Sequence, residues 1–248
     1  ARRAQSLGFP AIEIFPPDAD ALSPSKLPNI PSETGQSVAA IGSGGGWVRN
    51  RWHLTHPSAE IRQKALDFIR RLLDAAARFH APVIIGSMQG KHGDGVSLDR
   101  ALGWLGEALT LLGQHAKSLG TGVYYEPLNR YESNLMNTAR SAVDFLDKLK
   151  APGVQVLADL FHMNIEEQNV PETIIRLGAL HTDLIGHVHW ADSNRRAMGL
   201  GHTDYLAVYN ALNAVRYDRY LAAEVFPLPS AIEAASQTIS SIEASTSS

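Results

Sequence analysis

The sequence predicts an α/β protein, specifically a TIM-type (β/α)8 barrel, on three observations. Short strand-like segments alternate with helical patterns along the 248 residues. Several of these segments are almost continuous apolar runs, which is typical of parallel strands covered on both faces. Polar residues end the last four segments at intervals of 33, 30 and 35 residues, each the length of one strand and helix unit. Because no glycine-rich dinucleotide fingerprint follows an early strand, the barrel is favoured over an open doubly wound sheet.

Seven segments have the composition of strands, since they are short, rich in β-branched or aromatic residues and bounded by Gly or Pro. They are Ala11–Phe15, Val38–Gly42, Pro82–Ser87, Gly122–Pro127, Val154–Leu160, Ile185–Ala191 and Tyr220–Phe226. A barrel of this kind needs eight strands, and the chain opens on a helical segment that ends at Gly8. We therefore expect the first strand to be missing from this sequence, and residues 1–248 to form a single domain.

Helices are predicted between the strands by apolar residues that recur at helical spacing. The two longest patterns run from Ile61 to Ala76 and from Leu98 to Ala116. Residues typical of helix ends support these predictions. Ser97 and Thr138 stand where N-caps are expected, Ser230 and Glu233 form a capping box, and Gly120 follows a helix end.

Composition excludes several classes of function. Lys and Arg total 22 against 25 Asp and Glu, and a net charge of −3 gives no general attraction to nucleic acid or to an anionic membrane. The chain has no cysteine, which removes thiolate catalysis and cysteine zinc sites and suits a reducing compartment. Its apolar runs have strand length, and no apolar stretch follows the basic N-terminus. We expect no membrane span and no signal peptide, and a cytoplasmic protein.

Four polar residues at the ends of the last four strands are the strongest functional signal: Glu126, Asp159, His189 and Glu224. The C-terminal ends of all strands in such a barrel open on one face, so these side chains should meet there. Three carboxylates held close together repel one another unless they are protonated or bridged by a cation. One imidazole with carboxylate oxygens fits Mn²⁺, Mg²⁺ or Co²⁺ best, and Zn²⁺ or Fe²⁺ is also compatible. Any one of the four alone could equally be a strand-end group in a salt bridge.

Further polar residues follow the same strands. His162 lies three residues after Asp159, in what we expect to be a loop, and could reach a bound substrate or be a buried structural imidazole. His187 and His189 share one side of their strand, so position alone does not choose between them as ligands. Arg195 or Arg196 could bind a substrate oxygen, or form a salt bridge to a nearby loop.

Four motifs in order resemble ketose 3-epimerases of the tagatose and psicose type, which belong to the xylose-isomerase-like barrel superfamily. The motifs are Glu126–Glu132, Asp159–Glu167, Gly186–His189 with Ser193–Arg196, and Ala223–Phe226. The resemblance implies one divalent ion, Mn²⁺ by preference, bound by Glu126, Asp159, His189 and Glu224. It also implies a sugar held by Glu132, His162 and Arg195. His189 is chosen over His187 because Arg195 then follows the ligand by six residues, as in that family.

The implied reaction is the epimerisation of a ketose. A cation bound to a carbonyl and an adjacent hydroxyl acidifies the carbon-bound proton by stabilising an enediolate. Glu126 and Glu224 are the expected acid and base pair, one carboxylate removing a proton and the other returning one to the opposite face. If the proton moved to the neighbouring carbon instead, the same site would interconvert an aldose and a ketose. The expected partner is a small sugar, with no nucleic acid and no membrane, and the chain could form a homo-oligomer.

Two other classes remain open at this stage. Phosphodiesterases of the endonuclease IV type share the barrel, but would need more histidine ligands and a basic surface that the net charge of −3 disfavours. An accessory subunit, or a lyase acting on oxidised glycosides, is the third class. The intact set of candidate ligands argues against a scaffold without catalytic activity.

Overall fold

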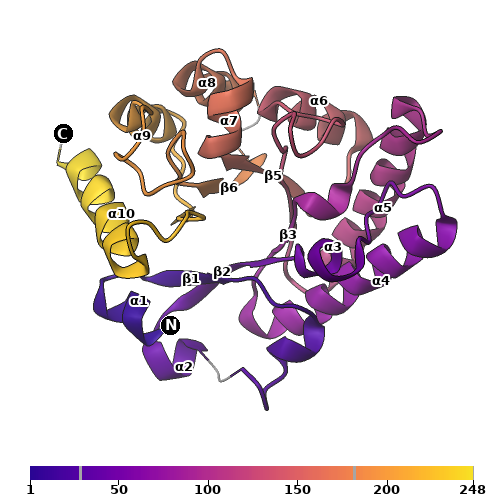
Figure 1. Ribbon diagram of the computed structural model, residues 1–248, viewed down its shortest axis with the longest axis horizontal. Helices are drawn as coiled ribbons and strands as arrows, with labels where there is room; N and C mark the ends of the chain where they lie inside the picture. Colours follow the sequence, from indigo (N-terminus) through magenta and orange to yellow (C-terminus); the bar gives the residue numbers. More distant parts are fainter. Residues whose placement is uncertain (28–29, 181–182, 248) are drawn as a thin grey trace.

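Seven parallel strands follow one another around a nearly closed barrel in chain order, with the helices outside them (Figure 1). The computed structural model describes residues 1–27, 30–180 and 183–247. The strands are β1 Ala11–Ile14, β2 Ser37–Gly42, β3 Val83–Ile85, β4 Val123–Tyr125, β5 Val154–Asp159, β6 Ile185–His189 and β7 Leu221–Ala222. Each strand pairs in parallel with the next along the chain. The predicted TIM-barrel class is confirmed.

Helices occupy most of the chain between the strands. The α-helices are α1 Arg2–Ser6, α2 Ile30–Thr34, α3 Gly45–Asn50, α4 Ala59–Ala76, α5 Leu98–Ser118, α6 Ala139–Leu149, α7 Leu160–Glu166, α8 Val170–Leu180, α9 Tyr205–Ala214 and α10 Ala231–Thr246. Short 3-10 turns are η1 Ala19–Leu22, η2 Ala77–Phe79 and η3 Ser87–Gln89. The predicted caps are present, because Ser97, Thr138 and Ser230 each accept a backbone N–H of the first helical turn. Among the described residues, no helix is both long and apolar enough to cross a bilayer.

The main core lies between the strands and the helices that cover them. Leu72 and Leu73 of α4 and Leu109 and Leu112 of α5 are fully buried there. Burying one such side chain contributes roughly 1.5–3 kcal/mol, so the apolar stripes of α4 and α5 stabilise the fold substantially. A second, smaller cluster of Ala40, Ile84, Tyr124 and Leu157 lies inside the barrel and closes its floor.

Two local expectations were wrong. β7 covers only Leu221–Ala222 instead of Tyr220–Phe226, because the following backbone leaves the sheet: the Phe226 N–H donates to the Arg195 carbonyl, and Pro227 has no N–H to pair. His162 lies in α7 and not in a loop. Asp159 begins that helix as its N-cap, since its carboxylate accepts the backbone N–H groups of Phe161 and His162.

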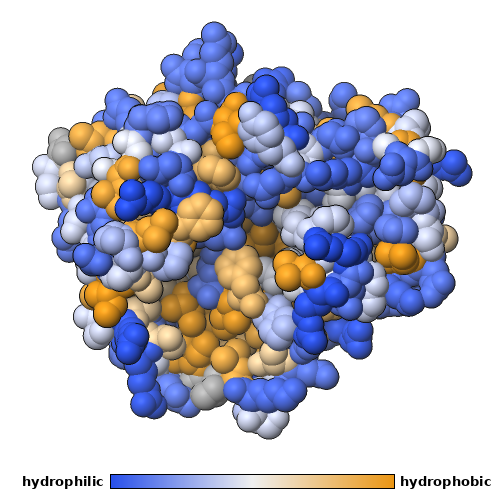
Figure 2. Space-filling model, in the orientation of Figure 1, coloured by the Kyte–Doolittle hydropathy of each residue, from blue (hydrophilic) through white to orange (hydrophobic). Residues whose placement is uncertain are grey.

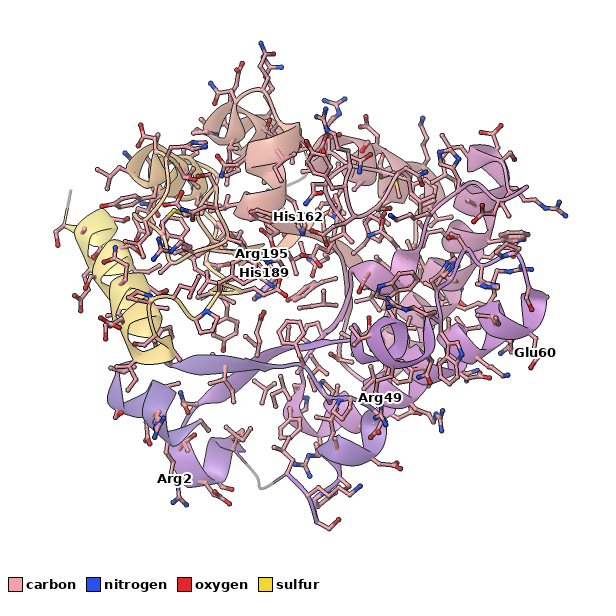
Figure 3. All side chains as sticks on the ribbon, viewed as in Figure 1. Arg2, Arg49, Glu60, His162, His189 and Arg195 are labelled. Carbon is pink, nitrogen blue, oxygen red and sulfur yellow. The ribbon has the colours of Figure 1, made fainter. Side chains whose placement is uncertain are left out.

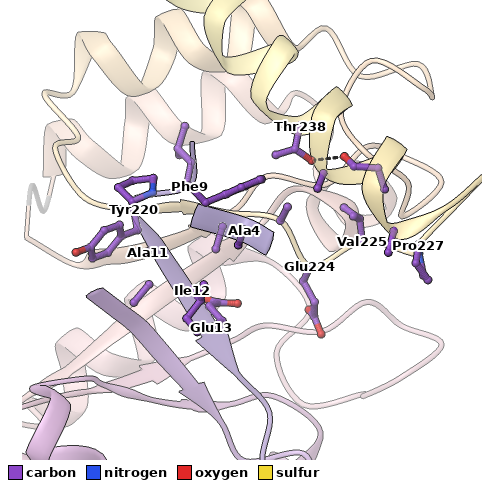
Figure 4. Close-up of a pocket in the computed structure, with 18 of the residues that line it drawn as sticks. Ala4, Phe9, Ala11, Ile12, Glu13, Tyr220, Glu224, Val225, Pro227 and Thr238 are labelled. Atoms are coloured by element: carbon purple, nitrogen blue, oxygen red, sulfur yellow. Dashed lines mark hydrogen bonds between the residues drawn. The ribbon is translucent and has the colours of Figure 1, made fainter. Parts of the chain in front are cut away.

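A cavity of about 460 Å³ separates β1 from β7, the first and last strands in the order. Apolar residues dominate its lining, which includes Phe9, Ile12, Leu221 and Val225 (Figure 4). The space-filling view shows apolar side chains within a hollow on this face of the molecule (Figure 2). Glu13 and Glu224 are the two carboxylates in the lining, so this cavity reaches the same end of the barrel as the polar residues described next.

Candidate active site

Glu126, Asp159, His189 and Glu224 meet at the C-terminal end of the strands, as the barrel requires. Measured from His189 Nδ1, Asp159 Oδ2 lies at 3.0 Å, Glu224 Oε2 at 3.2 Å and Glu126 Oε1 at 3.6 Å. One ligand atom from each residue lies within 4.8 Å of the others. Atoms on opposite sides of a divalent cation with bonds of about 2.1 Å lie roughly 4.2 Å apart, so the cluster has the size of a single-ion site.

Strand periodicity explains why these side chains face one another. Alternate residues of a strand point to the same face, and the barrel-floor residues Tyr124 and Leu157 stand two positions before Glu126 and Asp159. In the sheet register, Asp159 lies beside His189 on the neighbouring strand. The same alternation that fills the barrel floor with apolar groups therefore places the candidate ligands in the next layer above it.

The cluster holds three carboxylates close to one imidazole, and their mutual repulsion and burial change the pKa values of its members. Burial raises the pKa of Glu126, and the neighbouring charges of Glu224 and Asp159 raise it further. For His189, burial would lower the pKa, but Glu13, Asp159 and Glu126 hold it well above its usual value. Burial opposes ionisation of Asp159, but its hydrogen bond and charge interaction with His189 hold its pKa low. Protons therefore compensate part of the negative charge here, which is the role a bound cation would take over.

An unsatisfied atom also supports a cation at this place. Glu126 Oε1 is buried and has no hydrogen-bond partner among the described residues. A buried carboxylate oxygen without a donor is costly unless a cation or a substrate occupies the space beside it. The donor set of three carboxylates and one imidazole nitrogen suits a divalent ion of the Mn²⁺ or Mg²⁺ kind.

His162 is held in one tautomer by Asn129. The backbone N–H of Asn129 donates to His162 Nδ1 at 3.2 Å, and the Asn129 side-chain amide contacts the same nitrogen at 2.7 Å. Since Nδ1 accepts, the ring hydrogen is on Nε2, which lies 3.8 Å from Glu126 Oε1. His162 Nε2 has no hydrogen-bond partner among the described residues, so it presents a free donor to the site.

Arg195 lies on the same side of the cluster as His162, since both approach Glu132 Oε1. Its guanidinium donates to Glu224 Oε2 at 2.9 Å, lies 3.8 Å from Glu132 Oε1 and stacks over the Phe161 ring at 4.9 Å. Figure 3 shows His162, His189 and Arg195 grouped near the middle of the barrel, whereas Arg2 and Glu60 lie near the edge of the molecule. The structure thus brings all seven sequence-predicted site residues into one region.

The loop that carries Arg195 is organised by the buried side chain of Asp192. Its carboxylate accepts the backbone N–H groups of Ser193, Gly199, Gly201 and Thr203 at 2.7–3.1 Å. Hydrogen bonds from these groups outweigh burial and lower the pKa of Asp192. Arg195 itself has a left-handed backbone with φ of 57°, which this closed loop maintains.

A cavity of about 460 Å³ opens above the cluster. Its polar lining includes Glu126, Glu132, His162, Arg195 and Glu224, and its walls include Phe15, Pro17, Val48 and Leu128. Gly86 is essential to its shape, because a Cβ at this position would lie 2.3 Å from Glu126 Oε2. A volume of this size is at the lower end of the range typical of small-molecule sites.

His187 is not part of the four-residue cluster. Its Nε2 atom contacts Glu13 Oε1 at 2.5 Å, and its ring stacks on Tyr124 at 5.2 Å.

Four residues that shape the site were not predicted from the sequence: Glu13, Gly86, Asn129 and Asp192. The spacing of polar residues at strand ends does not point to these four residues. Only Glu13 has a visible signal, because it is a charged residue within the otherwise apolar predicted strand Ala11–Phe15.

The fold and this site define a barrel enzyme with a candidate metal centre, and comparison with known proteins places it in a family. The family model described as "Xylose isomerase-like TIM barrel" matches residues 1–242. The chain belongs to this family.

Its relatives include named epimerases. It is 34% identical over 203 residues to the 3-dehydro-D-guloside 4-epimerase of Escherichia coli strain K12, covering 77% of this chain and 73% of that protein. It is 28% identical to the D-psicose 3-epimerase of Agrobacterium fabrum strain C58, covering 90% of this chain and 77% of the relative. The apo crystal structure of 3-keto-D-glucoside 4-epimerase from E. coli superposes with a TM-score of 0.80 at 26% identity, covering 100% of this chain and 92% of that one. The assignment to the sugar isomerases and epimerases is confirmed.

Proposed function

We propose that this chain epimerises a keto sugar through proton transfer at a carbon next to the carbonyl group. Glu126, Asp159, His189 and Glu224 would hold one divalent cation, with Mn²⁺ the best match to the donors. The observation that carries the proposal is the grouping of these ligand atoms within 4.8 Å of one another at the base of a cavity into which polar side chains converge. Such a cation, when bound, withdraws electron density from a carbonyl and a neighbouring hydroxyl and so acidifies the adjacent C–H.

Glu126 and Glu224 are the acid and base pair in this proposal. Glu126 follows β4 and Glu224 follows β7, so the two carboxylates enter the site from different parts of the barrel wall. One carboxylate removes the proton from the carbon, and the other returns a proton to the opposite face, which inverts the centre. If one carboxylate served both steps on neighbouring carbons, the product would be an aldose.

Three further side chains would hold the sugar. His162 donates from Nε2, because Asn129 occupies its other nitrogen. Arg195 donates to a sugar oxygen while it remains paired with Glu224. Glu132 is partly exposed at the cavity and can accept a sugar hydroxyl. Together they fix which carbon faces the two carboxylates, and positioning of this kind supplies much of the rate acceleration in enzymes.

Two substrate classes fit the proposal. A free ketose is the first, in line with the psicose epimerase relative. A glycoside that carries a ketone is the second, favoured by 34% identity to the guloside epimerase and by apolar cavity walls, including Phe15 and Val48, against which an aglycone could pack. A nuclease function is disfavoured, because the four-residue cluster contains a single histidine.

The test is solvent exchange in deuterium oxide. The protein is stripped with a chelator, reloaded with Mn²⁺ and incubated with a panel of ketoses and 3-keto glycosides, and the sugars are followed by NMR. Deuterium should enter at one carbon next to the carbonyl, and exchange should fall at least a hundredfold in Glu126→Gln and Glu224→Gln. The matched control Glu167→Gln removes a half-buried carboxylate outside the site and should keep the exchange. No exchange with any sugar would refute the proposal.

A further inference from the structure

Glu13 of β1 contacts the metal-site histidine from the side opposite the cluster. Its Oε2 atom lies 3.4 Å from His189 Nε2, and its Oε1 atom lies 2.5 Å from His187 Nε2. The Glu13 side chain is only 8% exposed. A buried carboxylate of this kind must be compensated, and the two imidazoles of β6 are the groups that do so.

A local irregularity of β1 directs Glu13 into the barrel. The pairing of β1 with β2 shifts register between Ile12 and Glu13, so that Glu13 lies opposite Ala40, a residue of the barrel floor. Such irregularities commonly redirect one side chain of a strand. Figure 4 shows Glu13 on β1 and Glu224 beyond β7 in the same cavity, on either side of the gap between the two strands.

The tautomer of His189 links Glu13 to the cluster. An imidazole binds a cation through the nitrogen that carries no hydrogen, and its other nitrogen then carries the N–H. His189 Nδ1 faces the three carboxylates, so in the metal-bound protein the N–H is on Nε2. Nε2 has no hydrogen-bond partner among the described residues, and Glu13 Oε2 lies 3.4 Å from it. The second oxygen of Glu13 is fixed by His187, whose ring stacks on Tyr124 with an interplanar angle of 8°.

We propose that Glu13 is a positioning residue for the metal centre. It accepts the Nε2–H of His189, keeps Nδ1 free and directed at the cation, and adds a negative charge behind the ligand that strengthens the bond. The proposal rests on the proposed function, in that it assumes a cation in the four-residue cluster. Carboxylate partners of metal-bound histidines typically change metal affinity by 10–100-fold.

The experiment measures metal binding directly and needs no substrate. Metal-free wild type, Glu13→Gln and the control Glu167→Gln are titrated with Mn²⁺, with free Mn²⁺ counted by EPR. Co²⁺ is then used to record the visible ligand-field spectrum. Glu13→Gln should raise the Kd about 10–100-fold and change the Co²⁺ spectrum, whereas Glu167→Gln should stay within about twofold of wild type. Circular dichroism of the metal-free proteins checks the fold. If Glu13→Gln does not fold, Glu13→Asp, which withdraws the carboxylate by one methylene, should also raise the Kd.

Three results would overturn the proposal. An unchanged Kd in a folded Glu13→Gln protein would show that the contact has no influence on the site. An equal loss of affinity in Glu167→Gln would show a general effect of removing a buried charge. A second ion that disappears on substitution would make Glu13 a ligand, since Glu13, His187 and His189 themselves lie within 4.8 Å of one another. Failure of wild type to bind Mn²⁺ would instead refute the metal site of the proposed function, and with it the role of Glu13.

Discussion

The Nδ1 atom of His162 accepts the backbone N–H of Asn129 at 3.2 Å and lies 2.7 Å from its side-chain nitrogen. Asn129 Oδ1 in turn accepts the Tyr131 N–H at 3.0 Å, which fixes the orientation of the amide. The interaction decides where the ring hydrogen lies, and therefore which group His162 presents to a substrate. Asn129 is thus the residue that makes His162 a donor at Nε2.

Replacing Asn129 by Asp should weaken catalysis while keeping the fold. A carboxylate has no hydrogen to donate to Nδ1, so only the backbone N–H of residue 129 would remain to keep the ring hydrogen on Nε2, and the Nε2 donor is held less firmly. The loss of one hydrogen bond to the substrate, about 1–1.5 kcal/mol, corresponds to a fall of roughly tenfold in kcat/KM. Steady-state kinetics on the substrate found by deuterium exchange provide the measurement. The same substitution at the exposed Asn134 serves as the control, and equal kinetics in the two variants would contradict the role of Asn129.

Gly86→Ala should disturb the metal site without unfolding the barrel. The added Cβ would lie 2.3 Å from Glu126 Oε2, so this carboxylate must move away from its present position. We expect a weaker Mn²⁺ affinity, by about tenfold or more, measured by titration of metal-free protein.

Gly103 offers the matched control for that substitution. It lies in the interior of α5, and a Cβ there meets no atom within 4 Å among the described residues. Gly103→Ala should leave metal affinity unchanged and raise stability by about 0.5–1 kcal/mol. Unchanged Mn²⁺ affinity in Gly86→Ala would mean that Glu126 Oε2 has room to relax.

Periodicity was sufficient to predict the barrel and the place of the candidate ligands. Parallel strands share one orientation and bring their C-terminal ends to one face, so Glu126, Asp159, Glu224 and a histidine of β6 could be grouped from the sequence. The spacing did not separate His189 from His187, because both point into the barrel. The structure separates them by what they face: His189 faces the carboxylates, and His187 faces Glu13 and Tyr124.

Residues that act through another side chain could not be predicted in this way. Asp192 matters because four backbone N–H groups converge on it, and Gly86 matters because of the space beside it. Both properties depend on three-dimensional closure of loops, which leaves no periodic signal in a single sequence. The length of β7 was mispredicted for a related reason, since the Phe226 N–H pairs with a loop carbonyl and not with a strand.

Asp192→Asn should loosen the loop that carries Arg195. The amide group would place an N–H donor against backbone donors such as those of Gly199 and Gly201, at a cost of about 1–3 kcal/mol in the free energy of unfolding. KM should rise more than kcat falls, because Arg195 would bind the sugar less well. Denaturant unfolding and steady-state kinetics measure the two effects.

The stability loss in Asp192→Asn should depend on pH. Because the folded protein holds the pKa of Asp192 below its usual value, the carboxylate stabilises the fold above its unfolded pKa, and this contribution is lost as the pH falls through the lowered folded value. The difference in the free energy of unfolding between wild type and Asp192→Asn should therefore become smaller at acid pH. Asp204→Asn exchanges one good N-cap of α9 for another and should change stability little at any pH. An equal loss in both variants would contradict a special role for the Asp192 loop.

Metal affinity should strengthen as the pH rises. The pKa values of Glu126 and His189 are both raised in the metal-free site. Burial and the charges of Glu224 and Asp159 raise the pKa of Glu126, and Glu13, Asp159 and Glu126 raise that of His189 against the effect of burial. Both groups must lose their protons to bind a cation, so protons compete with the metal more strongly at low pH, and binding releases about one to two protons. Calorimetry of Mn²⁺ binding in two buffers with different ionisation enthalpies counts the released protons.

His53→Gln is the control for this measurement. The pKa of His53 is lowered to about 4 by burial and by His56, and this residue lies outside the lining of the site cavity. A Kd that does not change with pH would contradict the expected competition between protons and the metal at Glu126 and His189.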